Sequence, residues 1–359
     1  MNDRFENGIF GMIKPEDWLQ VGFDVERPND PTSQVFGDIK TDNLVAYWET
    51  MAAEYGIPVM AQFHAFDVES QKAIRVPIDA KNIEKGLIKE KIDQSERLRA
   101  LIGRGVTGTS ELYRRVLDDG FNLADHVFTR AIVAKNEALY SGKVTLKENG
   151  LDLTVDYGVP EANLSKTLDF GAGASAPMDE QLLELASEAT EKGVPLDTLY
   201  TTSADYNRLR KNSNIQKAIN GANMIGQLVR SADLRAYLSE EYGINRVLLQ
   251  DGVYSLPYTV GVDGRPVVSS QKMFKAGKYA FLHTNGGKIG DGIWGEPPEV
   301  SASKFMNVGG SGVSPYVYIS QYAENDPAVT WTKASALFMP VIYNPNALYV
   351  ATYANTPGA

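Results

Sequence analysis

The sequence predicts an α+β fold, in which helices and strands are mixed without the βαβ rhythm of a parallel sheet. The first observation is a long amphipathic helix that runs directly into a tight β-hairpin, over residues 109–157. The second is a series of short strands and capped helices after residue 178, and the third is a pair of apolar strands near the C-terminus. With 359 residues, the chain is long enough for roughly two or three hydrophobic cores, so more than one domain is expected.

Residues 1–50 are poorly patterned and predict an extended N-terminal arm. Prolines at positions 15, 28 and 31 interrupt the segment. Pro15 favours a short helix over residues 15–19, because proline suits the first helical position. Such an arm cannot bury enough surface by itself to offset the entropy of ordering it. The apolar side chains of Trp18 and Phe23 therefore indicate that the arm lies against the protein's own body or against a neighbouring subunit.

Residues 55–102 predict β-structure followed by a charged segment. Apolar residues alternate with other residues at positions 57–63 and again at 74–78, as in strands. Residues 82–102 form the most charged stretch of the chain, and two structures fit them. Ile88 and Ile92 follow helical spacing, whereas residues 87–92 also fit an exposed, charged strand. Such a charge-rich stretch usually forms a solvated face.

The helix predicted over residues 109–142 has one narrow apolar stripe. Its members recur with a period of about 3.6 residues: Leu112, Val116, Leu123, Val127, Ala131, Ala134 and Ala138. Charged residues lie off this stripe: Arg114, Arg115, Asp118, Arg130 and Lys135. An unbroken helix would be roughly 50 Å long at about 1.5 Å per residue. Gly120, followed by the capping residues Asn122 and Asp125, also allows two helices in line.

A β-hairpin follows directly after the helix. Val144 and Leu146 alternate with polar residues, Asn149-Gly150 provides a type I′ turn, and alternation resumes over residues 151–157. The simplest interpretation is a core helix and a surface hairpin of an ordinary α+β protein. The narrow stripe indicates, however, that the helix lies across one surface and shows its other faces to water or to another chain.

The C-terminal half contains a sequence of capped helices and short strands. A small-residue linker at residues 170–177 predicts a domain boundary. The predicted helices cover residues 178–192, 203–211 and 231–242. The predicted strands cover 196–202, 247–250, a hairpin at 258–268, 279–284, 316–320, 334–343 and 347–353. Residues 285–315 are rich in glycine and weakly periodic, so they predict long loops.

Composition excludes several classes of protein. The net charge is −10, from 45 acidic and 35 basic residues, and the basic residues are not clustered as nucleic-acid binding requires. No apolar run approaches a membrane span, and the N-terminus lacks a secretory signal pattern. Without cysteine there is no disulfide framework and no thiolate nucleophile. These features predict a protein that folds in a cytoplasm and does not bind membranes or DNA directly.

No motif predicts an active site. Residues 103–108 match G-x-G-x-x-G, but no clean strand precedes them, and the position for the acidic residue falls inside the long helix. The glycine-rich stretch 309–313 lacks the spacing of a nucleophile elbow. His64, His126 and His283 are far apart and lack metal-ligand spacing. We therefore expect no catalytic residue, no cofactor and no metal, and a protein that is not an enzyme.

Three stretches carry a resemblance to a known family. They are Ala138-Leu-Tyr-Ser-Gly-Lys-Val-Thr-Leu146, Gly277-Lys-Tyr-Ala-Phe-Leu-His-Thr-Asn285 and Ser335-Ala-Leu-Phe-Met-Pro-Val-Ile-Tyr-Asn-Pro-Asn346. Their order and spacing resemble those of a tailed-phage major capsid protein of the lambda type, the major capsid protein E family, which has the Hong Kong 97 capsid fold. The resemblance covers residues 55–359, and residues 1–50 match nothing.

The resemblance implies a division of the chain into parts. They are an N-terminal arm at 1–50, an extended loop at 51–103, a peripheral domain with spine helix and hairpin at 104–177, a mixed α/β axial domain at 178–330, and closing strands at 331–359 that return to the domains' shared core. The extended loop is a β-hairpin in this family. The resemblance therefore favours a strand over a helix for residues 82–102.

The resemblance also implies contacts between subunits. The residues expected to make them are Arg75, Lys89, Lys91, Arg97, Arg99, Trp18 and Phe23. Isolated exposed ion pairs contribute little, but many repeated pairs set the register of neighbouring chains. One branch with this fold links lysine to asparagine covalently. Lysines are present at positions 72, 81, 85 and 89, but none lies in a motif for this reaction, so we expect no crosslinks.

The partners implied are those of a phage head. Hexamers and pentamers would form an icosahedral shell, with a scaffold protein during assembly, a portal, and a decoration protein at three-fold sites. The shell would enclose double-stranded DNA without sequence-specific binding, and an acidic subunit would let that DNA lie inside without holding it. The protein would belong to the virion and be assembled in the host cytoplasm.

Two other functions compete with this one. An encapsulin-like shell has the same fold and would contain cargo protein. A soluble α+β enzyme would bind a nucleotide with its glycine-rich loops and would stay small. The size of the purified protein and the presence of cargo distinguish the three.

Overall fold

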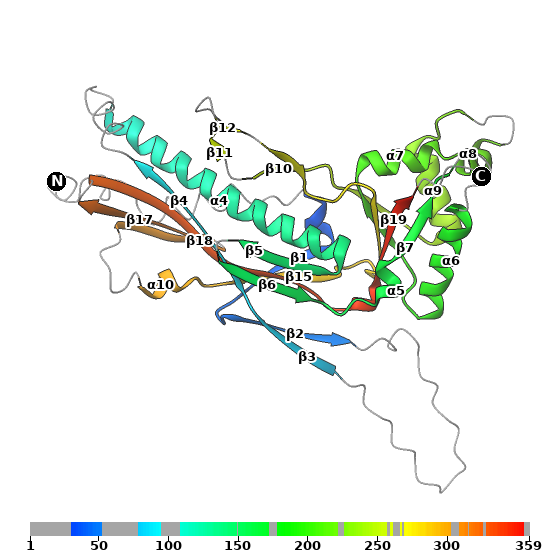
Figure 1. Ribbon diagram of the computed structural model, residues 1–359, viewed down its shortest axis with the longest axis horizontal. Coiled ribbons are helices and arrows are strands. Elements are labelled where there is room, and N and C mark those ends of the chain that lie inside the picture. Colours follow the sequence, from blue (N-terminus) through cyan, green and yellow to red (C-terminus); the bar gives the residue numbers. More distant parts are fainter. Residues whose placement is uncertain are drawn as a thin grey trace, which may run out of the picture.

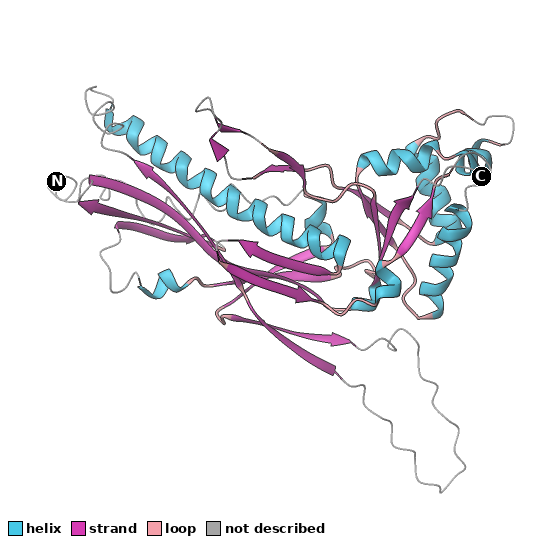
Figure 2. Cartoon of the chain, in the orientation of Figure 1, coloured by secondary structure: helices cyan, strands magenta, loops and turns pink. Residues whose placement is uncertain are grey.

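The computed structural model describes residues 30–51, 78–94, 108–148, 150–171, 178–221, 226–256, 259–260, 266–267, 269–302, 309–314, 316–325 and 328–354. Two sheets organise these residues. One long helix lies across the first sheet, a layer of shorter helices covers the second, and a hairpin projects from the body (Figure 1). Figure 2 shows the same division, with most of the helices gathered at one end of the molecule.

The first sheet is built around β18 (Ala328–Ile342). This strand pairs antiparallel with three others: β4 (Gly86–Gln94), β15 (Gly290–Gly295) and β17 (Val317–Asn325). β1 (Phe36–Thr41) pairs in parallel with β15, and β16 (Gly309–Ser314) pairs with β17. The sheet therefore combines the neighbouring strands β16, β17 and β18 with β1, β4 and β15 from earlier parts of the chain.

The long helix α4 (Gly108–Ser141) crosses this sheet as one unbroken element. The apolar residues of its predicted stripe that have described side chains are all buried: Leu123, Val127, Ala131, Ala134 and Ala138. Gly120 lies inside the helix and is buried. The alternative of two helices in line is therefore wrong. Gly142 ends the helix with φ of +67°, as expected for a glycine after a helix C-terminus.

The predicted hairpin consists of β5 (Lys143–Glu148) and β6 (Leu151–Asp156). Gly150 in the turn has φ of +84°, which glycine adopts without strain. Tyr157, at the end of β6, is fully buried, and its hydroxyl donates to the carbonyl of Pro340, with 2.5 Å between the oxygens. The hairpin is therefore attached to the C-terminal end of β18.

The first 51 residues contain two strands where an arm extending to residue 50 was expected. After a single turn η2 (Pro31–Gln34), β1 enters the first sheet, and β2 (Val45–Met51) pairs with β3 (Ile78–Glu84) in a separate hairpin. Lys85 separates β3 from β4. Residues 86–94 are a strand, so the resemblance predicted this segment better than its helical periodicity. The structure does not describe residues 95–107, which include the G-x-G-x-x-G glycines before Gly108.

The second sheet has the strand order β7-β19-β14-β8-β9. These strands are β7 (Lys166–Asp169), β8 (Thr198–Thr201), β9 (Arg246–Leu249), β14 (Lys278–Leu282) and β19 (Leu348–Ala354). Helices cover one face: α6 (Met178–Glu191), α7 (Ser203–Lys211), α8 (Ser213–Asn220) and α9 (Ser231–Tyr242). The other face joins the core beneath α4. This sheet is therefore shared by two hydrophobic cores.

The remaining elements are short. They are α5 (Glu161–Leu164), β10 (Val253–Ser255), β11 (Thr259–Val260), β12 (Pro266–Val267), β13 (Ser270–Lys272), α10 (Pro298–Ala302) and η6 (Pro345–Ala347). The predicted loop at 285–315 is wrong where β15, α10 and β16 form. Glycine is needed in β15 because a Cβ atom at Gly290 would lie 1.9 Å from the carbonyl oxygen of Val341.

None of the helices in the described ranges combines the length and the apolar character needed to span a bilayer.

Candidate assembly site

Strand β4 presents its alternate side chains to opposite faces of the first sheet. Ile88 and Ile92 pack against the core beneath α4. Lys89 and Lys91 lie between them in sequence and are exposed on the opposite face. Two of the predicted contact residues are therefore available to a second subunit.

The two lysines differ in how far the chain itself neutralises them. The ammonium of Lys89 lies 3.7 Å from Glu299 Oε1, which also accepts from Lys333 Nζ at 2.6 Å. Burial opposes ionisation of Glu299, but the lysine hydrogen bond and charges outweigh it and lower the pKa of this carboxyl. Among the described residues the ammonium of Lys91 contacts no carboxylate; it donates to the Tyr322 hydroxyl at 3.3 Å and lies 3.8 Å from the centre of the Trp331 ring. The described part of the chain thus places the charge of Lys91 against aromatic rings without a counter-ion.

Lys85 holds the base of the β2–β3 hairpin. Its side chain is buried, and its ammonium donates to Thr41 Oγ1 at 2.7 Å, to the carbonyl of Asn43 at 2.5 Å and to the carbonyl of Trp294 at 3.2 Å. Burial lowers the pKa of this lysine. Because its donors are used within the chain, Lys85 fixes the angle between the hairpin and the first sheet.

A second buried lysine joins α4 to β1. Lys135 Nζ donates to both carboxylate oxygens of Asp38, at 2.7 and 2.9 Å, and Trp294 Nε1 donates to the same carboxylate at 2.6 Å. Burial lowers the pKa of Lys135, and the charge of Asp38 opposes that shift. A Cβ at Gly292 would come within 2.7 Å of the Lys135 side chain. The glycine therefore provides the slot for this ion pair.

A closed ring of hydrogen bonds fixes the point where the N-terminal segment enters the body. Tyr200 donates its hydroxyl to Asn136 Oδ1 at 2.8 Å, so it accepts from Thr32 Oγ1 at 3.0 Å. Asn136 Nδ2 donates back to Thr32 Oγ1 at 3.1 Å. Gln250 donates to the same oxygen at 3.0 Å. One threonine therefore links η2, α4 and the second sheet through buried, satisfied partners.

The remaining predicted contact residues and the three histidines do not form a site in the described part of the chain. Trp18, Phe23, Arg75, Arg97 and Arg99 lie outside the described residues, as do His64 and Lys72. His126 contacts Glu90 at 2.8 Å, and His283 Nδ1 lies 2.6 Å from the carbonyl of Pro195. In the described ranges, no group of three His, Cys, Asp or Glu residues could hold a metal ion.

The residues that sequence reasoning missed are the buried ones, Lys85, Lys135 and Thr32. A charged residue off a helix stripe is normally exposed, so Lys135 was expected in solvent. The available signal was the spacing of glycines 290, 292 and 295. Gly292 and Gly295 provide room for Lys135 and Lys85 respectively.

Comparison with solved structures shows that this arrangement is the Hong Kong 97-like fold of phage capsid proteins. A protein described as a capsid protein of a prophage of E. coli CFT073 has 13% sequence identity and a TM-score of 0.55, covering 94% of this chain and 97% of that one. A phage-related protein from Bordetella bronchiseptica RB50 has 10% identity and a TM-score of 0.49, covering 95% and 97%. A subunit of the mature capsid of bacteriophage PhiM1 has 9% identity and a TM-score of 0.47, covering 92% and 89%.

The sequence itself identifies the family. Residues 88–353 match the family model described as phage major capsid protein E. The chain belongs to this family. It is therefore a structural protein of the virion, which assembles with copies of itself into a capsid shell, and it is not an enzyme. No curated protein matches the sequence.

Proposed function

We propose that this chain forms the icosahedral head of a tailed phage, as hexamers and pentamers that enclose double-stranded DNA. The observation that carries the proposal is the projecting β2–β3 hairpin, which pairs only with itself among the described residues and extends away from the body (Figure 1). A two-stranded hairpin is marginally stable at best in water. A neighbouring subunit beneath it would supply the surface that the hairpin lacks.

The charged face of β4 supports the same proposal. Lys91 is exposed and has no carboxylate partner in the described part of the chain. On the proposed neighbour it would meet an acidic side chain, as would Arg75, Arg97 and Arg99. Trp18 and Phe23 would anchor the N-terminal arm on an adjacent subunit. The Thr32 ring, at the start of the described residues, would then fix where that arm leaves the body.

The overall charge supports DNA storage without tight binding. At a net charge of −10, the subunit would repel the phosphate backbone at most of its surface. DNA would be retained by enclosure, and the shell would be built in the host cytoplasm before DNA enters. We include a scaffold protein, a portal and a decoration protein at three-fold sites in this proposal, and no lysine–asparagine crosslinks.

Assembly of the purified protein tests the proposal. The chain would be produced alone and together with its scaffold protein, and measured by light scattering and negative-stain imaging. Closed shells tens of nanometres across, empty of cargo protein, are expected in at least one condition. A monomer or dimer under both conditions contradicts the proposal, and shells that contain a co-purifying cargo protein would favour the encapsulin-like alternative.

A further inference from the structure

We propose that the helical layer on the second sheet joins two copies of this chain head to tail. The groove between α6 and α9 of one subunit would receive the α7–α8 end of the next. This inference rests on the proposed shell function and names two surfaces that meet within one ring of subunits. The partner is a second copy of the same chain, since the contact uses two different faces of it.

The order of the helices places the two surfaces at opposite ends of the layer. α6 packs beside α9, α9 beside α8, and α8 beside α7. Figure 1 shows α6 below the other three helices of this layer, with α9 between α7 and α8. Two different surfaces that point away from each other produce a ring when the rotation between subunits closes.

The two ends carry opposite charge. α6 has only acidic charged residues, Asp179, Glu180, Glu184, Glu188 and Glu191, of which Glu188 is paired with Lys166 and Lys192. α7 and α8 carry Arg208, Arg210, Lys211 and Lys217, and their one acidic residue, Asp205, is buried in a bond to Arg208. An acidic surface and a basic surface on the same chain attract when copies meet head to tail, but repel when like surfaces meet.

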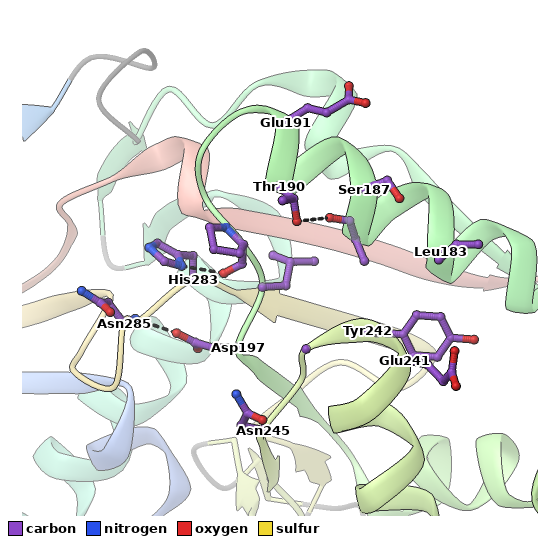
Figure 3. Close-up of a pocket in the computed structure, with 14 residues that line it drawn as sticks. Leu183, Ser187, Thr190, Glu191, Asp197, Glu241, Tyr242, Asn245, His283 and Asn285 are labelled. Carbon is purple, nitrogen blue, oxygen red and sulfur yellow. Dashed lines mark hydrogen bonds between the residues drawn. The ribbon is translucent and has the colours of Figure 1, made fainter. Parts of the chain in front are cut away.

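The acidic end is a groove of about 590 Å³. Figure 3 shows Leu183, Ser187, Thr190 and Glu191 along the α6 wall, opposite Glu241 and Tyr242. Leu183 is 54% exposed, which leaves a large apolar side chain uncovered in the isolated subunit. The groove thus combines an apolar contact with an acidic rim.

The floor of the groove is fixed, so its free charge lies on the rim. The Asp197 carboxylate accepts from Thr284 N at 2.8 Å and from Asn285 N at 2.6 Å. His283 Nδ1 donates to the carbonyl of Pro195, which can only accept. Glu191 and Glu241 have no cationic partner in the part of the chain that the structure describes. These two carboxylates are therefore open to a partner's cations.

The basic end has a matching apolar residue. Leu228, between α8 and α9, is 52% exposed. Its segment is held by Arg210 Nε, which donates to the carbonyl of Val229 at 2.8 Å, and by Gly226 N, which donates to Gln216 Oε1 at 2.8 Å. Lys211 and Lys217 are exposed and have no acidic partner among the described residues. In the proposed contact Leu228 meets Leu183, and the lysines meet Glu191 and Glu241.

Charge reversal on each surface tests the contact. Glu191→Lys/Glu241→Lys makes both surfaces basic, and Lys211→Glu/Lys217→Glu makes both acidic. We expect each variant to lower shell yield by about tenfold or more, and the fourfold variant to regain most of the yield, because complementarity is restored with reversed sign. Leu228→Ser should lower the yield without changing charge complementarity at the rim, because serine is uncharged. Thermal unfolding of each unassembled variant confirms that its subunit is folded.

Mixing the two charge-reversed variants tests the head-to-tail geometry separately. Each variant repels itself but attracts the other, so the variants alternate around a ring. Alternation closes a hexamer but not a pentamer, so rings or open sheets should form without closed shells. This inference is overturned if either variant with one reversed surface assembles like wild type, or if the fourfold variant recovers no yield. Shells formed by wild type would uphold the proposed function in either case. If wild type forms no shells, the proposed function fails, and association of the mixed variants by sedimentation still tests the contact.

Discussion

Lys85 and Lys135 hold this subunit together from inside, although lysine is usually a surface residue. Each has most of its donors satisfied by atoms from segments distant in sequence, including the carbonyl of Trp294 for Lys85 and the carboxylate of Asp38 for Lys135. A sequence pattern cannot reveal such burial, because it depends on β1 and β15 arriving beside α4. A single chain also cannot show which of the predicted residues make contacts between subunits. Lys89, for example, is partly neutralised by Glu299 of its own chain, and contacts with another subunit require a second copy to be seen.

The Lys135–Asp38 pair is expected to contribute strongly to stability. Asp38→Asn leaves a buried ammonium without its counter-ion and should lower the free energy of unfolding by about 3 kcal/mol or more. Lys135→Met leaves the Asp38 carboxylate unpaired, and because that side chain is 29% exposed, this loss should be smaller. The double variant should be less destabilised than the sum of the two by more than about 1 kcal/mol. Urea unfolding of the unassembled subunit measures all three. Additive losses would show that the two charges do not depend on each other.

Helices and strands with capping residues and a clear periodicity of apolar residues were predicted from sequence. Elements that depend on a neighbouring strand or side chain lying close to their backbone were not. α4, the β5–β6 hairpin, and α7 and α9 follow from periodicity, capping residues and an Asn-Gly turn, but whether α4 is one helix or two in line was left open by Gly120. α8 was missed because Asn212 ends α7 and caps α8 with no loop between them. β15 was missed because its glycines resemble a loop, yet each lets a neighbouring strand or side chain approach. For β4, local periodicity fitted a helix and a strand equally.

The contact between α4 and β4 is expected to depend on pH through His126. The hydrogen bond to Glu90 raises the pKa of this histidine, partial burial opposes the shift, and the charges of Glu90 and Asp125 reinforce it. A raised pKa in the folded state means that the contribution is complete below the unfolded-state value of about 6.5 and is lost as pH rises through the folded-state pKa.

A His126→Gln variant measures that contribution. Both side chains of the pair are about half exposed, so the effect should stay below about 1 kcal/mol. Wild type should exceed the variant in unfolding free energy by more at about pH 5.5 than at about pH 8.5. Glu90→Gln should remove most of the pH-dependent difference, because the charge of Asp125 remains. A difference that is larger at the higher pH would contradict the assignment.

At the scale of the whole molecule, one sheet is shared between two cores, so the two halves of the subunit fold together. The chain completes both sheets at its C-terminal end, where η6 links β18 in the first sheet to β19 in the second. The β2–β3 hairpin extends from this body, and no third strand pairs with it among the described residues. The sequence revealed the fold class and the family, whereas in the proposed shell another copy of the chain would supply the surface that completes the hairpin.

Electron cryo-microscopy of assembled particles would show whether the β2–β3 hairpin joins neighbouring subunits. We expect closed shells in which the hairpin of each subunit lies on the body of its neighbour, and in which Lys91 faces an acidic side chain of another copy. Particles in which the hairpin contacts only its own subunit, or a protein that stays monomeric with its scaffold present, would rule out the proposed shell contacts.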